Sequence, residues 1–298
     1  SVLAFPKYNM PEGVTAVSHD IYQLHMLIFY ICMAIGFGVF AVIVFIMVKH
    51  RKSRGVVPAQ FHSNTTIEVV WTVIPLLILM AMAVPSTLVM IRANDASKPD
   101  INIKVVGFQW KWKYEYLDEG IKFFSALSTP PEQYLNHEEK QRWYLLEVDH
   151  PLVVPVKKKV RLLITSNDVN HSWWVPEFGV KKDAIPGLIN EAWFKVEKPG
   201  TYRGQCTELC GMRHGYMPIV VVAKAEQDYQ DWLSEQKTGK PVIRAGRVRH
   251  HSSLAIENVA IVWDKAKLLE KGKTVYNRAC SVCHQSSGVG MPPAFPAL

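Results

Sequence analysis

One stretch of twelve residues decides how this chain is interpreted: CTELCGMRHGYM, residues 206–217. Within it lie two cysteines, a histidine and a methionine. Thiolate, imidazole and thioether are donors that copper prefers, and mononuclear blue copper sites combine Cys and His with a weak axial Met. Cys210, His214 and Met217 fit that pattern, and Cys206 is an additional thiol. The additional thiol leaves a disulfide, a zinc site or a second metal ion as alternatives.

The segments that flank this loop have the character of β-strands, GTYRGQC at 200–206 and MPIVVVAK at 217–224. Gly211, Gly215 and Pro218 oppose a helix between them, so we expect the loop to close a β-hairpin. Short apolar or alternating segments elsewhere predict further strands: FQWKWKYEY at 108–116, YLLEV at 144–148, VRLLITS at 160–166 and EAWFKV at 191–196. Closely spaced strands with turn residues between them predict an all-β sandwich or barrel. Residues 126–143 are expected to form an insertion, and residues 226–236 a short amphipathic segment.

A second histidine follows a predicted strand, in NDVNHSWWVP at 167–176. Aromatic neighbours would shield His171 from water, although a lone histidine of this kind is more often structural. A disulfide would explain neither His214 nor Met217, and zinc would leave the thioether unused. Two copper ions with both sulfurs bridging would use every donor. The favoured hypothesis is therefore a binuclear copper site.

The chain contains two apolar segments of 25 residues each, Leu24–Val48 and Ile67–Ile91. Each is longer than the about 20 residues that a helix needs to cross a bilayer. We expect transmembrane helices at about 22–48 and 67–91. The connecting loop carries four basic residues and no acidic one: Lys49, Arg51, Lys52 and Arg54. The positive-inside rule places this loop in the cytoplasm and both termini on the periplasmic side. The chain begins at Ser1 without Met, and the sequence does not show whether a signal peptide preceded it.

Hydrophobic residues make up 49% of the chain, and the net charge is +8. Residues 237–278 alone hold ten basic and three acidic residues. We interpret residues 237–256 as a basic linker. Because the sequence contains no recognisable nucleic-acid-binding domain that carries these basic residues, the positive charge gives no support to nucleic-acid binding.

Four motifs in the expected order resemble cytochrome c oxidase subunit II. They are TIEVVWTVIP at 66–75, GFQWKWKYEY at 107–116, NDVNHSWWVPEFGVKKDAIPG at 167–187 and CTELCGMRHGYMP at 206–218. The resemblance covers nearly all of residues 20–225. It implies an N-terminal part, residues 1–92, with the two-helix hairpin, and a periplasmic cupredoxin domain at 93–236 that carries the CuA centre. The implied copper ligands are His171, Cys206, Cys210, His214, Met217 and the backbone carbonyl of Glu208.

The resemblance also implies roles for three further groups. Trp110 would be the aromatic through which electrons reach copper, although the sequence alone favours an ordinary core residue. Glu68 would lie at the mouth of a proton channel into the catalytic subunit, since an ionisable residue in a membrane span is a functional hypothesis. The carboxylate of Glu208 would help to hold a magnesium ion shared with subunit I.

The C-terminus carries CSVCH, the attachment motif of c-type haem. Cys280 and Cys283 would form the thioether bonds, and His284 would be the proximal iron ligand. Residues 257–298 resemble the start of an α-helical cytochrome c domain of the kind fused to some bacterial subunits II. A distal methionine is usual, but Met291 follows His284 by only seven residues. We therefore expect a longer polypeptide with the sixth ligand beyond Leu298.

The resulting hypothesis is subunit II of a bacterial haem-copper cytochrome c oxidase in the inner membrane. It would accept electrons from fused or external cytochrome c and pass them through CuA to haem in subunit I, where oxygen reduction is coupled to proton pumping. Subunit I and subunit III are the expected partners. One alternative is the electron-transfer subunit of another terminal enzyme, such as nitric oxide reductase. A copper-delivery protein is a second alternative, and it would need an exposed, labile site. A quinol oxidase subunit is disfavoured because it has no reason to keep copper ligands.

Overall fold

The computed structural model describes residues 9–55, 57, 60 and 62–239, and scattered positions at 266, 269–270, 272–273, 276–277, 281, 285–287 and 289. The chain divides into two compact units, Ser1–Val242 and Ile243–Leu298. The predicted haem motif, Cys280, Cys283 and His284, lies outside the described residues, as does most of the predicted cytochrome c segment. The fold that follows is that of the first unit.

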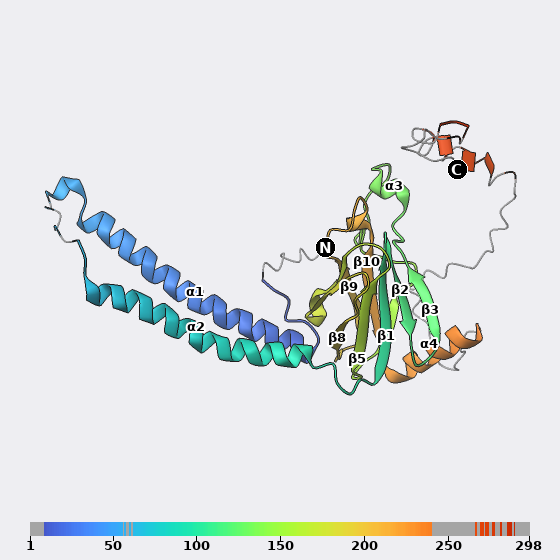
Figure 1. Ribbon diagram of the computed structural model, residues 1–298, viewed down its shortest axis with the longest axis horizontal. Coiled ribbons are helices and arrows are strands. Elements are labelled where there is room, and N and C mark those ends of the chain that lie inside the picture. Colours follow the sequence, from blue (N-terminus) through green and yellow to red (C-terminus); the bar gives the residue numbers. More distant parts are fainter. Residues whose placement is uncertain are drawn as a thin grey trace. The chain divides into compact units, whose positions relative to one another are not determined.

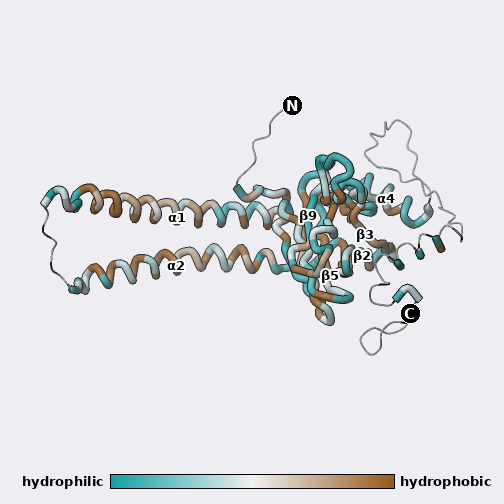
Figure 2. Tube along the Cα trace, turned by 90° about the horizontal axis from the view of Figure 1, so that it is seen from above, coloured by the Kyte–Doolittle hydropathy of each residue, from teal (hydrophilic) through white to brown (hydrophobic). Residues whose placement is uncertain are grey.

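Two long helices begin the unit, α1 (Ala16–Lys49) and α2 (Thr65–Asn94). They contain both predicted spans, lie side by side (Figures 1 and 2) and are long and apolar enough to cross a membrane. Their apolar side chains are largely exposed. Figure 2 shows apolar residues, in brown, along both helices. Because water does not favour so much exposed apolar surface, this surface fits a lipid or protein environment. A short 3-10 helix, η1 (Lys52–Arg54), lies in the connecting loop.

The β-domain consists of two five-stranded sheets, which confirms the predicted all-β architecture. The first sheet has the order β3 (Ile121–Ser125), β2 (Lys111–Tyr116), β1 (Ile101–Phe108), β5 (Val160–Ser166) and β8 (Asn190–Phe194). The second has the order β4 (Leu152–Pro155), β10 (Pro218–Lys224), β9 (Gly200–Cys206), β6 (His171–Val175) and β7 (Val180–Ala184). The β1–β5 and β4–β10 pairs are parallel, and the other pairs are antiparallel. One core joins the sheets, and its largest buried side chains include Trp112, Trp173, Phe178 and Phe194.

Shorter elements connect and cover the sheets. The short helix α3 (Pro131–Tyr134) lies in the predicted insertion, and the 3-10 helices η2 (Pro176–Phe178) and η3 (His214–Tyr216) follow β6 and precede β10. Helix α4 (Glu226–Thr238) contains the predicted amphipathic segment. Its buried Tyr229 and Leu233 form a small cluster with Val153 of β4.

Two strand predictions were wrong. Residues 108–116 do not form one strand, because Gln109 and Trp110 make the turn of the β1–β2 hairpin, in which Phe108 pairs with Lys111. The three later aromatics of the segment alternate into the core as predicted. Residues 144–148 do not form a strand either, since Leu145 has a left-handed backbone with φ of 58° that interrupts an extended chain. Only Val148 forms an isolated bridge, with Leu127.

Candidate metal centre

The donor-rich loop lies at one end of the sandwich, between antiparallel strands β9 and β10 as predicted. Cys206 is the last residue of β9, and Met217 directly precedes β10. His214 begins η3 within the loop. His171 is the first residue of β6, which lies beside β9 with Trp173 opposite Cys206. Strand pairing therefore brings the distant histidine to the loop.

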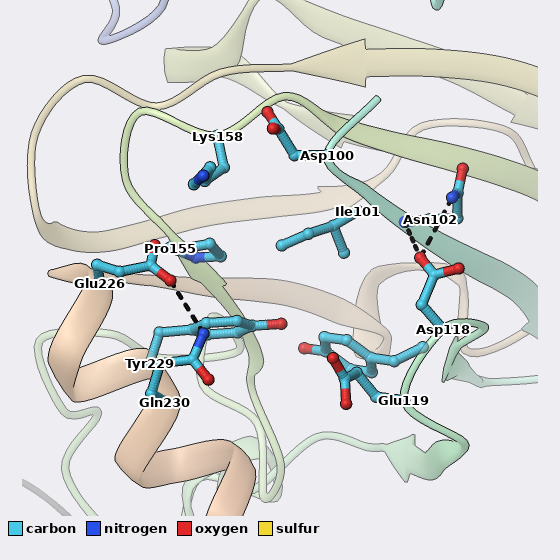
Figure 3. Close-up of a pocket in the computed structure, with 11 residues that line it drawn as sticks. Asp100, Ile101, Asn102, Asp118, Glu119, Pro155, Lys158, Glu226, Tyr229 and Gln230 are labelled. Carbon is cyan, nitrogen blue, oxygen red and sulfur yellow. Dashed lines mark hydrogen bonds between the residues drawn. The ribbon is translucent and has the colours of Figure 1, made fainter. Parts of the chain in front are cut away.

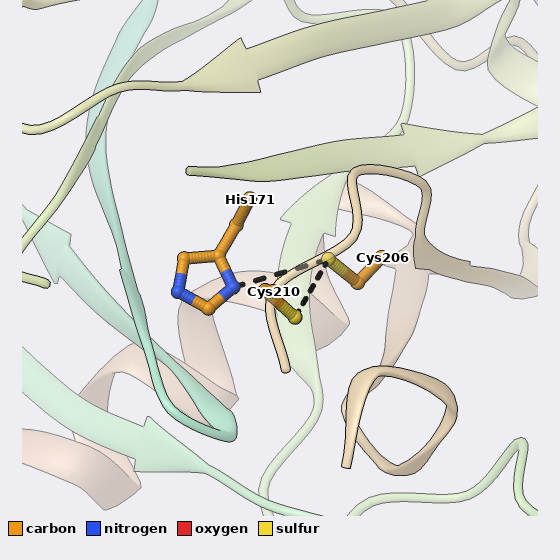
Figure 4. A group of neighbouring side chains, drawn as sticks. All are labelled: His171, Cys206 and Cys210. Carbon is orange, nitrogen blue, oxygen red and sulfur yellow. Dashed lines mark hydrogen bonds between the residues drawn. The ribbon is translucent and has the colours of Figure 1, made fainter. Parts of the chain in front are cut away.

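The two thiols lie at the centre of the donors. Their sulfur atoms are 3.8 Å apart and do not form a disulfide. His171, Cys206 and Cys210 have ligand atoms within 4.8 Å of one another (Figure 4). The Cys206 sulfur lies 3.9 Å from Nδ1 of His171 and 3.4 Å from the carbonyl oxygen of Glu208. Glu208 itself is exposed.

The Cys210 sulfur has an equivalent set of neighbours. It lies 3.4 Å from Nδ1 of His214 and 3.6 Å from the Met217 sulfur. Each sulfur thus has one imidazole nitrogen and one weaker donor beside it. This near-symmetrical arrangement suits two metal ions that share both thiolates.

Copper accepts every donor in this set, because thiolate, imidazole and thioether are all among its ligands. Zinc would take two thiolates and two imidazoles but would leave the Met217 thioether and the Glu208 carbonyl unused. His171, Cys206, Cys210 and Met217 are all at most 5% exposed. The buried position excludes bulk water from the sulfur atoms.

The electrostatics of the two thiols favour one negative charge at a time. Burial raises the pKa of Cys206, but hydrogen bonds with His171 and with backbone groups of Ser172 and Glu208 outweigh it and leave that pKa lowered. Burial and the charge on Cys206 raise the pKa of Cys210 to about 12. A cation that binds both sulfurs must therefore displace a proton from Cys210.

Glycines at two positions allow close packing around these candidate donors. A Cβ atom at Gly107 of β1 would lie 2.7 Å from the His171 ring, so a side chain there would displace the imidazole. Gly211 has φ of 111°, a conformation that other residues rarely adopt, and a Cβ atom there would lie 3.1 Å from the Trp110 ring. A side chain at either position would therefore collide with an aromatic ring at the candidate centre.

The structure also brings Trp110 to the centre. Its indole N–H donates to the carbonyl oxygen of Cys210 at 3.1 Å. Two groups at the site were missed by the sequence analysis, Gln109 and Asp168. Gln109 donates from its side chain to the same carbonyl at 3.0 Å, and Asp168 lies 2.8 Å from Nε2 of His171. A carboxylate three residues before a candidate metal-binding histidine was the available signal for Asp168.

Glu68 is not part of this centre. It lies in the first turn of α2, where its carboxylate accepts a hydrogen bond from the backbone N–H of Asn64 at 3.3 Å. The Asn64 side chain in turn accepts from the N–H of Ile67. In the described structure Glu68 thus helps to cap the helix, at the end of α2 remote from β1 (Figure 1).

A cavity of about 210 Å³ lies beside α4, at the end of β1 and β2 that is remote from the β1–β2 turn (Figure 3). Its lining includes several carboxylates: Asp100, Asp118, Glu119 and Glu226. Within the described residues, however, only His171, Cys206 and Cys210 form a group close enough to share a metal ion. The loop of β9 and β10 is therefore the candidate metal centre.

Comparisons with known proteins agree on one family. A family described as cytochrome C oxidase subunit II, periplasmic domain, matches residues 101–224, and the corresponding transmembrane-domain family matches residues 5–89. A probable cytochrome c oxidase subunit 2 of Rickettsia bellii (strain RML369-C) is 40% identical over 221 residues, which is 74% of this chain and 80% of the relative. Cytochrome c oxidase subunit 2 of Cereibacter sphaeroides is 38% identical over 240 residues, 76% of this chain and 79% of the relative. The crystal structure of the periplasmic domain of subunit II of cytochrome oxidase from Bradyrhizobium japonicum is 39% identical and covers 48% of this chain and 98% of that chain, with a TM-score of 0.44.

Proposed function

Because this chain belongs to the cytochrome c oxidase subunit II family, we propose that its converging sulfur, imidazole and carbonyl donors are the ligands of the CuA centre. The ligands are His171, Cys206, Cys210, His214, Met217 and the backbone carbonyl of Glu208. The chain is the electron-transfer subunit of the oxidase complex, anchored in the membrane by two helices, and subunit I is its partner. Oxygen reduction takes place in subunit I.

The single observation that supports this ligand set most strongly is the arrangement around the two sulfurs. When bound, the copper pair would supply reversible one-electron transfer. The chain supplies the geometry: Cys206 is held by β9, His171 by β6, and both Cys210 and Met217 pack in the sandwich core. Donors that are fixed by a rigid sandwich change position little when their metal changes charge, and this lowers the reorganisation that each transfer requires.

Trp110 is the proposed group through which electrons reach the centre. Its ring is partly buried against the core, and its N–H donates to the Cys210 carbonyl. The partly exposed ring thus joins the protein surface to a copper ligand by one hydrogen bond. The donor is cytochrome c, fused or external.

The remaining assignments concern protons, further cofactors and orientation. Glu68 is proposed to lie at the mouth of the proton channel into subunit I. The Glu208 carboxylate is proposed to bind a magnesium ion that is shared with that subunit. Haem c is proposed on Cys280, Cys283 and His284. Subunit III is a further proposed partner. Both termini and the β-domain are proposed to lie on the periplasmic side of a bacterial inner membrane.

Burial of the ligands argues against a copper-delivery protein. Such a protein needs a site from which copper is released readily, whereas the described thiols and His171 are enclosed by the core. The family matches also do not favour a subunit of nitric oxide reductase.

The test is copper loading of the full chain in detergent. We expect two copper ions per chain and an electron paramagnetic resonance spectrum with the hyperfine pattern of one unpaired electron shared by both ions. Cys206→Ser should abolish this pattern, because one bridging sulfur is lost. Cys32→Ser is the matched control and should leave the pattern unchanged, since Cys32 lies on α1. A single copper ion with a four-line spectrum in the unsubstituted chain would contradict the ligand set.

A further inference from the structure

One carboxylate, that of Asp168, contacts two parts of the metal centre at once. Its Oδ1 atom lies 2.8 Å from Nε2 of His171, and its Oδ2 atom accepts the backbone N–H of Gln109 at 2.7 Å. Asp168 itself is held by its own loop, because its Oδ1 also accepts the N–H of Val169 and its backbone N–H donates to Ser166. Its own loop therefore holds this carboxylate independently of its contacts with His171 and Gln109.

The contact with His171 determines which ring nitrogen faces the thiols. A carboxylate oxygen only accepts hydrogen bonds, so His171 must carry its proton on Nε2. Nδ1, which lies 3.9 Å from the Cys206 sulfur, is then the ring nitrogen that can donate to a metal ion. His171 is completely buried, so water cannot offer an alternative partner to the ring.

The contact with Gln109 determines the position of the β1–β2 turn. This two-residue turn reaches the ligand loop through both of its side chains, since Gln109 and Trp110 donate to the carbonyl of Cys210. The Asp168 carboxylate holds the start of the turn by accepting the backbone N–H of Gln109. The same carboxylate thus links the orientation of His171 to the contact between Trp110 and Cys210.

We infer that Asp168 is a positioning residue for electron transfer, which sets the tautomer of His171 and holds the Trp110 turn against Cys210. Outer groups that hold a metal-binding histidine in this way orient the ring, and their loss typically lowers metal affinity about 10- to 100-fold. In this protein the role has a second part, because the other carboxylate oxygen positions the aromatic group. The inference rests on the proposed ligation by His171.

Asp168→Asn separates the two parts, because an amide has one accepting and one donating end. If the amide oxygen faces His171, its NH2 group opposes the N–H of Gln109 and displaces the turn. If the oxygen faces Gln109, the NH2 group faces Nε2 of His171, and the ring proton moves to Nδ1, where it blocks the metal. No orientation of the amide satisfies both contacts.

The matched control is Asp118→Asn. Asp118 also accepts two hydrogen bonds, from the backbone and side chain of Asn102, but it lies after the other end of β2. Asp168→Ala serves as the second variant and keeps the test decisive if the asparagine variant does not fold. It removes both acceptors without adding an opposing donor.

The full chain without metal, labelled with ¹⁵N-histidine and ¹⁵N-tryptophan in detergent, gives the first readout by nuclear magnetic resonance. We expect a single Nε2–H form of His171 in the unsubstituted chain and in Asp118→Asn. In Asp168→Asn we expect either the Nδ1–H form or faster hydrogen exchange at the Trp110 indole. In Asp168→Ala we expect mixed tautomers together with faster exchange. His171→Asn and Trp110→Phe identify the two signals.

Copper affinity gives the second readout, and we expect it to fall about 10- to 100-fold in both Asp168 variants. The inference is overturned if both variants keep the Nε2–H form, slow indole exchange and unchanged copper affinity. The metal-free spectra do not depend on the number of copper ions bound. A failure of the proposed CuA centre would therefore be distinguishable from a failure of this inference.

Discussion

The carbonyl oxygen of Cys210 accepts two side-chain hydrogen bonds, from Gln109 at 3.0 Å and from Trp110 at 3.1 Å. Carbonyl oxygens have two lone pairs, so both bonds can form together. They connect the β1–β2 turn to the backbone of a proposed copper ligand. At the scale of single residues, the environment of the centre is therefore made by backbone groups as much as by the ligands' own side chains.

Trp110→Phe should slow the reduction of copper by the electron donor while copper remains bound. Phenylalanine keeps an aromatic ring but loses the N–H that contacts Cys210. The measurement is stopped-flow absorbance of the copper centre in the full chain. Trp143→Phe is the control, because Trp143 is a partly exposed tryptophan that packs on Arg203. Equal rates of copper reduction in the unsubstituted chain, Trp110→Phe and Trp143→Phe would show that Trp110 is an ordinary core residue.

Glu68→Gln should slow turnover of the assembled oxidase and leave the copper spectrum unchanged. Glutamine retains an oxygen that can accept from the Asn64 N–H, so the cap of α2 is kept while the ionisable group is lost. Oxygen consumption and the paramagnetic resonance spectrum measure the two effects separately. Slower reduction of copper in this variant would show that electron transfer, and not proton delivery, depends on Glu68.

At the scale of elements, the start of α1 is attached to the β-domain by a buried cap. Thr15 accepts a hydrogen bond from the N–H of Ser18 at 3.0 Å and donates to the carbonyl of Phe178 in η2 at 2.8 Å. The backbone N–H of Val14 donates to Glu177 at 2.8 Å. The end of α2 is attached too, because the indole of Trp193 in β8 donates to the carbonyl of Arg92 at 3.2 Å. Both helices thus meet the β-domain through hydrogen bonds.

Thr15→Ala should weaken this attachment. The loss of a helix N-cap typically costs about 1 kcal/mol, and here the Phe178 carbonyl also loses its donor. Amide hydrogen exchange in the first turn of α1 should become faster, while the strands of the sandwich keep their protection. Thr66→Ala, an exposed substitution in the first turn of α2, should leave exchange in α1 unchanged. Unaltered exchange in Thr15→Ala would show that the cap contributes little.

At the scale of the whole molecule, charge and hydropathy together predict how the chain lies in the membrane. The loop between α1 and α2 carries four basic residues and no acidic one: Lys49, Arg51, Lys52 and Arg54. The β-domain follows α2 directly, since α2 ends at Asn94 and β1 begins at Ile101. A cytoplasmic loop therefore requires a periplasmic β-domain.

Cysteine labelling of intact cells tests this orientation. In a Cys32→Ser background, Gln227→Cys on exposed α4 should react with a membrane-impermeant maleimide added outside the inner membrane. Ser53→Cys in the connecting loop should react only after the membrane is opened. The reverse pattern would place the β-domain in the cytoplasm. Labelling of both variants after lysis confirms that each thiol is accessible.

Much of the fold could be predicted because its signals are local. The apolar runs within α1 and α2 predict helices by length and composition, and the segments at 160–166 and 200–206 form β5 and β9 as expected. The predictions at 108–116 and 144–148 were wrong where a turn interrupts an apolar pattern. Periodicity shows which face a side chain takes, but it does not show where the chain reverses.

The donor types of the candidate centre can be recognised from local sequence, because Cys206, Cys210, His214 and Met217 lie within one loop. Which of these donors face one another depends on the folded domain. The β6–β9 pairing brings His171 to Cys206, and the β1–β2 turn brings Trp110 to Cys210. The same holds for Asp168, whose second contact is with a residue 59 positions away. The physical reason is that such neighbours result from strand pairing and core packing, which depend on the whole β-domain and not on nearby sequence.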